Sequence, residues 1–225
     1  MQPLLLFFFF FLTAVFGLPT GLVLSDSNVD IVARDAACTK LISQLTTIAS
    51  GTSTCDTATN YKNECRTASQ AAEPILTAFS KYQITNANEQ AAVIALMLYE
   101  SGEFKYNWGH FVAGEDVHTP GKGTRNMQSA DYNEKYARTL FSSSEVDAAK
   151  SKDPNDGVLQ LVSPDEPSFG SASWFLTSQC TASQRTALQS GSQDGFEQYV
   201  SVCIGGTMDQ DRIDYWTKAK AALAG

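Results

Sequence analysis

The sequence has little basic charge. Its 225 residues hold 16 Lys and Arg against 24 Asp and Glu, so the formal net charge is −8. Lys and Arg nowhere form the cluster that phosphate binding requires, which argues against nucleic acid as a partner. The same balance disfavours binding to an anionic cell surface at neutral pH. That objection weakens in an acidic medium, where Asp and Glu begin to protonate.

Several motifs of common enzymes are also missing. There is no Gly-x-Ser-x-Gly elbow, which argues against a serine hydrolase of that type, and "GKGT" follows no strand–helix pattern that would cradle a phosphate. Two histidines and two acids, His110, Glu115, Asp116 and His118, lie close together in a polar segment, but their spacing matches no metal motif. We therefore expect no metal and no cofactor.

Long apolar runs are absent except at the N-terminus. The opening "MQPLLLFFFFFLTAVFG" has an apolar run of about 15 residues, shorter than the roughly 20 that span a bilayer, and Pro19 and Gly21 close it. It predicts a secretory signal peptide over residues 1–17, and a membrane anchor is the alternative. Residues 18–35 are either a propeptide or the mature N-terminal arm, and 36–225 form one domain. We expect a secreted, extracellular monomer with no membrane contact after signal removal.

Five cysteines then become disulfide candidates, because secreted proteins fold in an oxidising environment. Cys180 and Cys203 stand alone in the C-terminal half and are predicted to pair. Cys55 and Cys65 bracket a polar connection and form the preferred second pair, leaving Cys38 free. Pairing of Cys38 with either neighbour stays open.

Hydrophobic periodicity predicts a mainly α fold of the α+β type. A buried central helix begins at a cap at Asn88 and ends near Tyr99 or Ser101, with Gly102 as its stop. The glycine-rich segment 103–128 predicts a loop and short β-hairpin, long enough to be a functional insertion. The other predicted helices cover residues 36–50, 58–82, 129–140, 171–177, 182–189, 192–203 and 209–223. A further helix is predicted to start at Ser144, with Asp147 in its first turn, and "SKDPNDG" is a predicted surface turn.

Glu100 ends an almost unbroken apolar run, "EQAAVIALMLY", which should lie inside the protein. Burial and the negative end of the helix dipole both disfavour its charged form, and no basic residue lies within four positions before it. A carboxylic acid held protonated is what cleavage of a glycosidic bond requires. The alternative is a helix-end Glu that points into water.

The run "LYESGEFKYN", followed by "GKGTRNMQS" and "ADYNEKYA", resembles the lysozyme superfamily. It looks most like secreted fungal muramidases, which are lysozyme-like glycoside hydrolases, and more distantly like goose-type lysozymes and lytic transglycosylases. "WFLTSQC" and "GFEQYVSVC" extend the similarity over most of the mature chain. The chain has "TRNMQ" where lytic transglycosylases have Gly-Leu before Met-Gln. The resemblance implies a lysozyme-like fold, in which a buried central helix ends at the catalytic Glu and a small β-hairpin and loop form the opposite wall over a cleft.

By this resemblance Glu100 is the general acid and Gln128 lines the cleft. Arg125 and Asn126 either bind substrate or hold the hairpin against the helix, and an internal salt bridge is the other reading of Arg125. Among the acids of the opposite wall, Asp116 is the preferred second catalytic carboxylate. Glu103 and Glu115 are the other candidates, and a mechanism with one carboxylate stays open.

Aromatic side chains stack on sugar rings, and Tyr106, Trp108 and Tyr132 are placed to do so, with core packing as the alternative. Asn107 is positioned to contact an N-acetyl group. Together these features predict a muramidase that hydrolyses the β-1,4 bonds between N-acetylmuramic acid and N-acetylglucosamine of bacterial peptidoglycan. Chitinase, chitosanase or lytic transglycosylase activity on the same scaffold and a non-catalytic glycan-binding protein are the alternatives.

Overall fold

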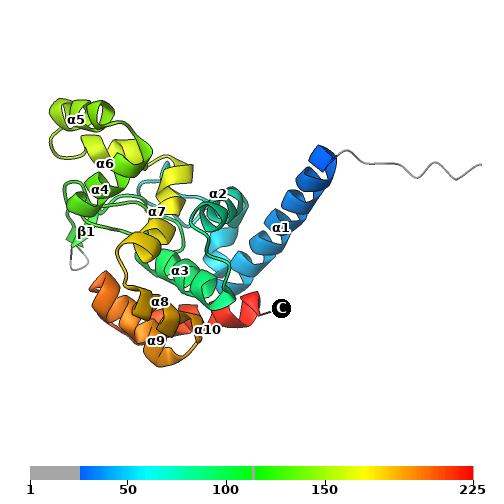
Figure 1. Ribbon diagram of the computed structural model, residues 1–225. Helices are drawn as coiled ribbons and strands as arrows, with labels where there is room; N and C mark the ends of the chain where they lie inside the picture. The colour runs from blue at the N-terminus through cyan, green and yellow to red at the C-terminus, as the bar shows by residue number, and fades with distance from the viewer. Residues whose placement is uncertain (1–25, 113–114, 225) are drawn as a thin grey trace, which may run out of the picture.

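A computed structural model describes residues 26–112 and 115–224 (Figure 1). The predicted signal peptide, residues 1–17, lies outside the described residues, as does the start of the 18–35 segment. The described part is mainly helical, as the sequence predicts, and its short sheet has two strands. No helix in this part is long and apolar enough to cross a membrane.

Helix α3 (Ala87–Glu100) forms the centre of the molecule. Every residue from Ala91 to Leu98 is buried, which explains why the run has no polar face. Its N-cap is Asn86, whose side chain accepts hydrogen bonds from the backbone N–H of Asn88 and Glu89. The predicted cap at Asn88 is therefore two residues too late. The helix ends at Glu100, as the sequence predicts to within a residue.

The chain reverses sharply after Glu100. Gly102, Glu103 and Phe104 all have positive φ angles, of 59°, 60° and 66°. Such angles are costly for Glu and Phe. Full burial of the Phe104 ring against Phe169 and a hydrogen bond from the Phe104 backbone N–H to the Ser101 hydroxyl offset the cost. This turn directs the chain away from α3 and into the opposite wall.

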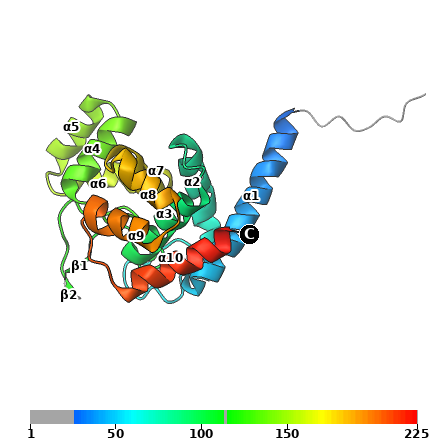
Figure 2. The ribbon, with the colours of Figure 1, turned by 60° about the horizontal axis from the view of Figure 1, so that its bottom comes forward.

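The helices around α3 form the larger core. Helix α1 (Asp26–Ile48) begins ten residues before the predicted start at residue 36, so residues 26–35 of the predicted arm are helical. Its first turns stand clear of the body, and its last turns bury Leu41, Leu45 and Ile48 (Figure 1). Helix α10 (Gln210–Leu223) packs on α3 and lies beside the inner end of α1 (Figure 2).

Helix α2 (Ala68–Lys81) is shorter than the predicted 58–82 helix. Thr67 and Gln70 form a capping box at its start, and the disulfide at Cys65 holds the preceding residues in turns. Pro74 lies inside this helix. The remaining helices of the larger core are α7 (Asp165–Ser178), α8 (Ala182–Gln189), α9 (Gln193–Glu197) and the π-helical segment η2 (Gln198–Ile204).

A smaller core lies under α4 (Ala130–Leu140), α5 (Ser143–Lys152) and α6 (Gly157–Val162). Helix α6 was not predicted from the sequence. It has only six residues, too few to show a helical period, and it directly follows the predicted turn. Helix α5 is capped by Ser142 with Glu145, not by the predicted Ser144 with Asp147. Helix α7 contributes to both cores, through Phe169 to the larger and Trp174 to the smaller, and so joins them.

The segment between α3 and α4 is irregular, as predicted. It contains the antiparallel strands β1 (Phe111–Val112) and β2 (Glu115–Asp116). The turn η1 (Ser50–Ser53) follows α1. Disulfide bonds join Cys55 to Cys65 and Cys180 to Cys203, the pairs that the sequence analysis prefers, and Cys38 on α1 is free.

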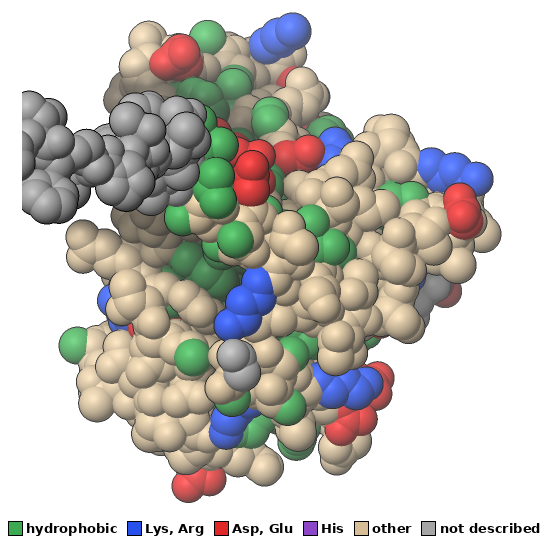
Figure 3. All heavy atoms as spheres, turned by 90° about the vertical axis from the view of Figure 1, so that its right-hand side faces the viewer, with side chains coloured by type: hydrophobic (Ala, Val, Ile, Leu, Met, Phe, Trp, Pro, Cys, Tyr) green, Lys and Arg blue, Asp and Glu red, His purple; other side chains and the backbone are tan. Residues whose placement is uncertain are grey.

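Surface charge is dispersed on the face that carries α1. In Figure 3, Lys and Arg side chains lie singly or beside acidic ones, without forming a continuous basic surface on that face. Binding of a polyanion such as nucleic acid needs a continuous basic surface. The face drawn in Figure 3 therefore has no surface of the kind that binds a polyanion.

Candidate functional site

Two adjoining hollows meet at Glu100. The larger, of about 390 Å³, is lined by Glu100, Lys122, Asn126, Met127, Gln128, Ser129, Tyr132, Phe175, Ile204, Gly205, Gly206, Thr207 and Arg212. The smaller, of about 170 Å³, is lined by Glu100, Tyr106, Trp108, Gly109, His110, Phe111, Lys122 and Met127. Because both share Glu100, Lys122 and Met127, we describe them as one groove with Glu100 at its middle.

Glu100 is half-buried at the end of α3, with 19% of its side chain exposed. Its Oε1 atom accepts a hydrogen bond from Nη2 of Arg212 at 2.5 Å. No basic residue lies within four positions before Glu100 in the sequence, but its cationic partner comes from α10, 112 residues later. The contact is a charge-assisted hydrogen bond, which is stronger than one between neutral groups.

Arg212 is itself held in place from two sides. Its guanidinium lies 3.8 Å from the centre of the Tyr99 ring, and its backbone N–H donates to Oδ1 of Asp209 at 2.9 Å. The Tyr99 hydroxyl donates to Asp209 as well, and this bond raises the pKa of Tyr99. Burial alone would raise the pKa of Asp209, but its hydrogen bonds from Tyr99 and Arg212 outweigh burial and lower it. Asp209 is thus an ionised anchor.

One wall of the groove is a row of amide side chains. Asn126 donates to Gln128 at 3.1 Å, Gln128 donates to Asn133 at 2.9 Å, and Asn133 donates to the backbone oxygen of Gly121 at 2.8 Å. All three side chains are at least 94% buried. The Oδ1 atom of Asn126 has no hydrogen-bond partner among the described residues. Asn126 lines the groove, but its Oδ1 atom is itself buried.

The predicted aromatic residues line different parts of the groove. Tyr106 and Trp108 line the smaller hollow, and Tyr132 lines the larger. The indole N–H of Trp108 donates to the Ser163 hydroxyl at 2.8 Å, and its ring stacks near His118. These contacts fix the plane of the indole ring without removing it from the groove.

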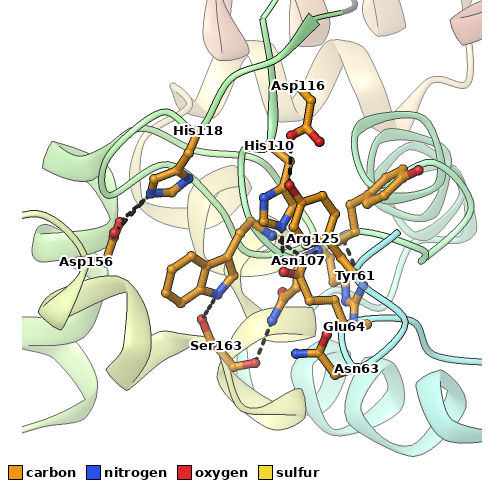
Figure 4. Close-up of polar contacts among 12 residues, drawn as sticks. Tyr61, Asn63, Glu64, Asn107, His110, Asp116, His118, Arg125, Asp156 and Ser163 are labelled. Carbon is orange, nitrogen blue, oxygen red and sulfur yellow. Dashed lines mark hydrogen bonds and ion pairs between the residues drawn. The ribbon is translucent and has the colours of Figure 1, made fainter. Parts of the chain in front are cut away.

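Two predicted substrate-binding residues, Arg125 and Asn107, do not line the groove. Figure 4 shows both among the polar contacts around Glu64. Arg125 is fully buried and donates to the backbone oxygens of Phe104, Tyr106 and Glu64 at 2.6–2.9 Å. Burial lowers its pKa to about 9. Asn107 is also buried, and its Nδ2 atom donates to the Ser163 backbone oxygen at 2.8 Å. Both residues brace the wall.

Glu64 is a polar residue of this wall that the sequence analysis missed. Its Oε2 atom accepts from the backbone N–H of Asn107 at 2.8 Å and of Trp108 at 3.0 Å. Its Oε1 atom lies 2.5 Å from Nε2 of His110, whose ring stacks on Tyr61 (Figure 4). Glu64 precedes a disulfide cysteine and lies 43 residues before Asn107, so no local pattern predicts these contacts.

The predicted second carboxylate does not reach the groove. Asp116 is exposed on β2, where it accepts a hydrogen bond from the Tyr61 hydroxyl at 2.8 Å, and it is not a lining residue. Glu115 is exposed beside it. Glu103 accepts from the Tyr215 hydroxyl at 2.8 Å and lines a separate acidic depression. The turn after α3 therefore carries Glu103 away, and Glu100 is the one carboxylate that lines the groove within the described residues.

The histidines of this segment each pair with one acid. His118 lies 3.0 Å from the carboxylate of Asp156, and His110 pairs with Glu64. Across the part of the chain that the structure describes, no three His, Cys, Asp or Glu side chains form a group that could hold a metal ion. The four residues His110, Glu115, Asp116 and His118 thus do not assemble.

Comparison with known proteins gives one partial relationship to report. The chain is 35% identical over 161 residues to a "Bifunctional dioxygenase (DOX)-epoxy alcohol synthase (EAS)" of Fusarium oxysporum (strain Fo5176). The match covers 68% of this chain but only 12% of that much longer protein. No family model matches the sequence. No solved structure matches it either.

Proposed function

We propose that the protein is a secreted muramidase of lysozyme-like fold that cleaves the glycan strands of bacterial peptidoglycan. The observation that carries the proposal is the position of Glu100 at the end of buried helix α3 and in the middle of the groove. A buried helix that ends at an acid, opposite a wall with a β-hairpin, is also what the resemblance to fungal muramidases implies. The two disulfides agree with secretion.

The charges that line the groove favour an anionic glycan. Two basic residues, Lys122 and Arg212, line the groove, and one acidic residue, Glu100, does so. The groove therefore has an excess of basic residues, although the whole chain carries a net charge of −8. Peptidoglycan carries carboxylates on its muramic acid and peptide, chitin is neutral, and chitosan is cationic. Electrostatic complementarity therefore ranks peptidoglycan first and chitosan last.

A single carboxylate is sufficient for the chemistry. Protonated Glu100 donates its proton to the oxygen that links two sugars, and the bond from that oxygen to the anomeric carbon breaks with the electron pair on the oxygen. A water molecule then adds to the anomeric carbon and returns one proton to Glu100. Capture by the 6-hydroxyl of the same sugar instead of water gives an anhydro product, as in a lytic transglycosylase.

The bound sugars have partners on both sides of Glu100. Trp108 and Tyr106 offer aromatic faces on one side, and Tyr132 does so on the other. The buried, unpartnered Oδ1 atom of Asn126 is the acceptor that we assign to a sugar hydroxyl or an N-acetyl N–H that reaches past the surface of the groove. The fixed row of amides holds this acceptor in place, which lowers the entropy cost of binding.

The test is release of reducing ends from purified peptidoglycan, chitin and chitosan by the parent protein and by Glu100→Gln. Glu103→Gln is the matched control, because Glu103 lies three residues further on but outside the groove. We expect cleavage of peptidoglycan by the parent and the control and none by Glu100→Gln. Equal inactivity of the folded parent and Glu100→Gln on all three polymers would reject a glycoside hydrolase, and binding without cleavage would indicate a glycan-binding protein. Product mass separates hydrolysis from anhydro-sugar formation.

The Fusarium relative supports a second candidate. Its name assigns dioxygenase and epoxy alcohol synthase activities to the whole protein, of which this chain matches 12%. If the matched part contributes to the dioxygenase activity, this chain would add both atoms of O₂ to a substrate of that enzyme. Oxygen uptake by the purified chain with that substrate tests this. Uptake that persists in Glu100→Gln would place the activity outside the groove.

A further inference from the structure

Lys122 is a basic residue of the groove whose ammonium group is not engaged by the described part of the chain. It lines both hollows, as Glu100 does. The ion pairs found among the described residues involve other basic side chains: Arg34, Arg66, Lys105, His110, His118, Arg138, Lys150, Arg185 and Arg212. Lys122 is partly buried, but its Nζ atom is not one of the buried polar atoms that lack a hydrogen-bond partner. The ammonium group is therefore in contact with solvent.

The other basic residue of the groove, Arg212, is committed to Glu100. Only 6% of Arg212 is exposed, its Nη2 atom donates to Glu100, and its Nε and Nη1 atoms are buried. A guanidinium enclosed in this way reaches a ligand only by leaving the carboxylate. Of the two basic side chains that line the groove, Lys122 is therefore the one available to a substrate.

The chain around Lys122 holds its stem against the wall of the groove. Its backbone oxygen accepts a hydrogen bond from the Gly109 N–H at 2.9 Å. A Cβ atom added at Gly109 would lie 3.0–3.2 Å from the Cβ, Cγ and Cδ atoms of Lys122, so the glycine leaves room for the stem. The next residue, Gly123, forms β-bridges with Trp108 and Gln128. The base of the side chain is thus fixed, while rotation about its last bonds lets Nζ adjust to a ligand.

We propose that Lys122 recognises the muramic acid carboxylate of a bound glycan strand and so makes the protein prefer anionic strands to neutral ones. The inference rests on the proposed function, which takes the groove to be the site of cleavage. It adds the residue that reads the charge and the chemical group that it reads.

The position of Lys122 determines where this carboxylate lies. Because Lys122 and Glu100 both line both hollows, the ammonium group accompanies the sugars next to the reacting bond and not a distant part of the strand. The attraction between an ammonium group and a carboxylate acts over several Å, so an exact hydrogen-bond geometry is not required. Since Nζ is in contact with solvent, the effect should be moderate and should decrease as salt is added.

The test compares two matched substrates. One is soluble glycan strands freed from their peptides, whose muramic acid carboxylates are free, and the other is the same strands after conversion of these carboxylates to methylamides. The variants are Lys122→Gln, Lys122→Arg and, as a control, Lys152→Gln, which removes the charge of an exposed lysine at the end of α5. The readout is the ratio of kcat/KM for the two substrates, because a merely structural role of Lys122 would lower both values together.

The parent and Lys152→Gln should prefer the charged strands by about fivefold, and this ratio should fall as NaCl is added. Lys122→Gln should cleave both substrates equally, and Lys122→Arg should keep most of the preference because it keeps the charge. If circular dichroism shows that Lys122→Gln is unfolded, Lys122→Met decides in the same way, because it keeps an apolar stem over Gly109.

Two results would overturn the inference and leave the proposed function standing. One is equal cleavage of charged and neutral strands by the parent, and the other is a preference that Lys122→Gln retains in full. A folded parent that cleaves neither substrate would overturn the proposed function and the inference with it.

Discussion

Glu64 and Glu100 are two partly buried carboxylates whose surroundings differ in kind. Both oxygens of Glu64 are engaged, one by two backbone N–H groups and the other by His110. Glu100 has one hydrogen-bond donor, Arg212, and faces the groove. Only 11% of the Glu64 side chain is exposed, against 19% of Glu100. The availability of its oxygens, more than its burial, therefore distinguishes Glu100, the proposed acid, from Glu64.

The largest expected effect is that of Glu100→Gln on activity. The substitution keeps the size of the side chain but removes the proton donor, so the rate of peptidoglycan cleavage should fall by about 10³-fold. Affinity for the glycan should remain. The measurement is initial rates of reducing-end release together with binding of soluble fragments, and a fall of less than tenfold would contradict the role of Glu100.

Glu64→Gln should show the opposite pattern. An amide cannot accept from both backbone N–H groups and pair with His110 as the carboxylate does, so the free energy of unfolding should fall by about 2–3 kcal/mol. Urea unfolding measures it. The control is Glu73→Gln, an exposed partner of Arg34 that should change stability by less than about 0.5 kcal/mol. If Glu64→Gln lost activity without losing stability, Glu64 would be more than a brace.

Removal of the free acceptor in the groove tests binding alone. Asn126→Ala should raise KM several-fold and leave kcat nearly unchanged, because one hydrogen bond to a sugar is worth about 1 kcal/mol. Steady-state kinetics on soluble fragments separate the two constants. Asn155→Ala, in an exposed turn, is the control. A large loss of kcat in Asn126→Ala would place Asn126 at the reacting bond.

The smallest effect is expected at Asp116. It is exposed and outside the groove, so Asp116→Asn should change the cleavage rate by less than about twofold. The same assay applies. A fall comparable to that of Glu100→Gln would restore Asp116 as the second carboxylate and would mean that the hairpin closes over the groove when substrate binds.

Local patterns in the sequence predict the parts of this molecule that depend on neighbouring residues. Helix α3, its acid at the end, the stop at Gly102 and the irregular wall all follow from composition and periodicity. Gln128 also lies in the groove, as the motif "TRNMQS" suggests. These features need no knowledge of distant contacts.

The partners of the two carboxylates could not be predicted in this way. Arg212 meets Glu100 across 112 residues, and Glu64 meets His110 across 46 residues. Arg125 and Asn107 were assigned to the substrate because a polar residue in an irregular segment looks the same whether it faces inward or outward. Only the path of the chain after Phe104 decides that direction, and the path depends on burial of Phe104 against Phe169.

The most direct test of the account is a crystal structure of Glu100→Gln with a peptidoglycan tetrasaccharide bound. We expect the glycan to lie along the groove past Trp108 and Tyr132, with a linking oxygen within about 3 Å of the side chain at position 100. Arg212 should remain beside that side chain. A glycan bound elsewhere, or one whose linking oxygens all lie beyond hydrogen-bond reach of position 100, would contradict the central role of Glu100.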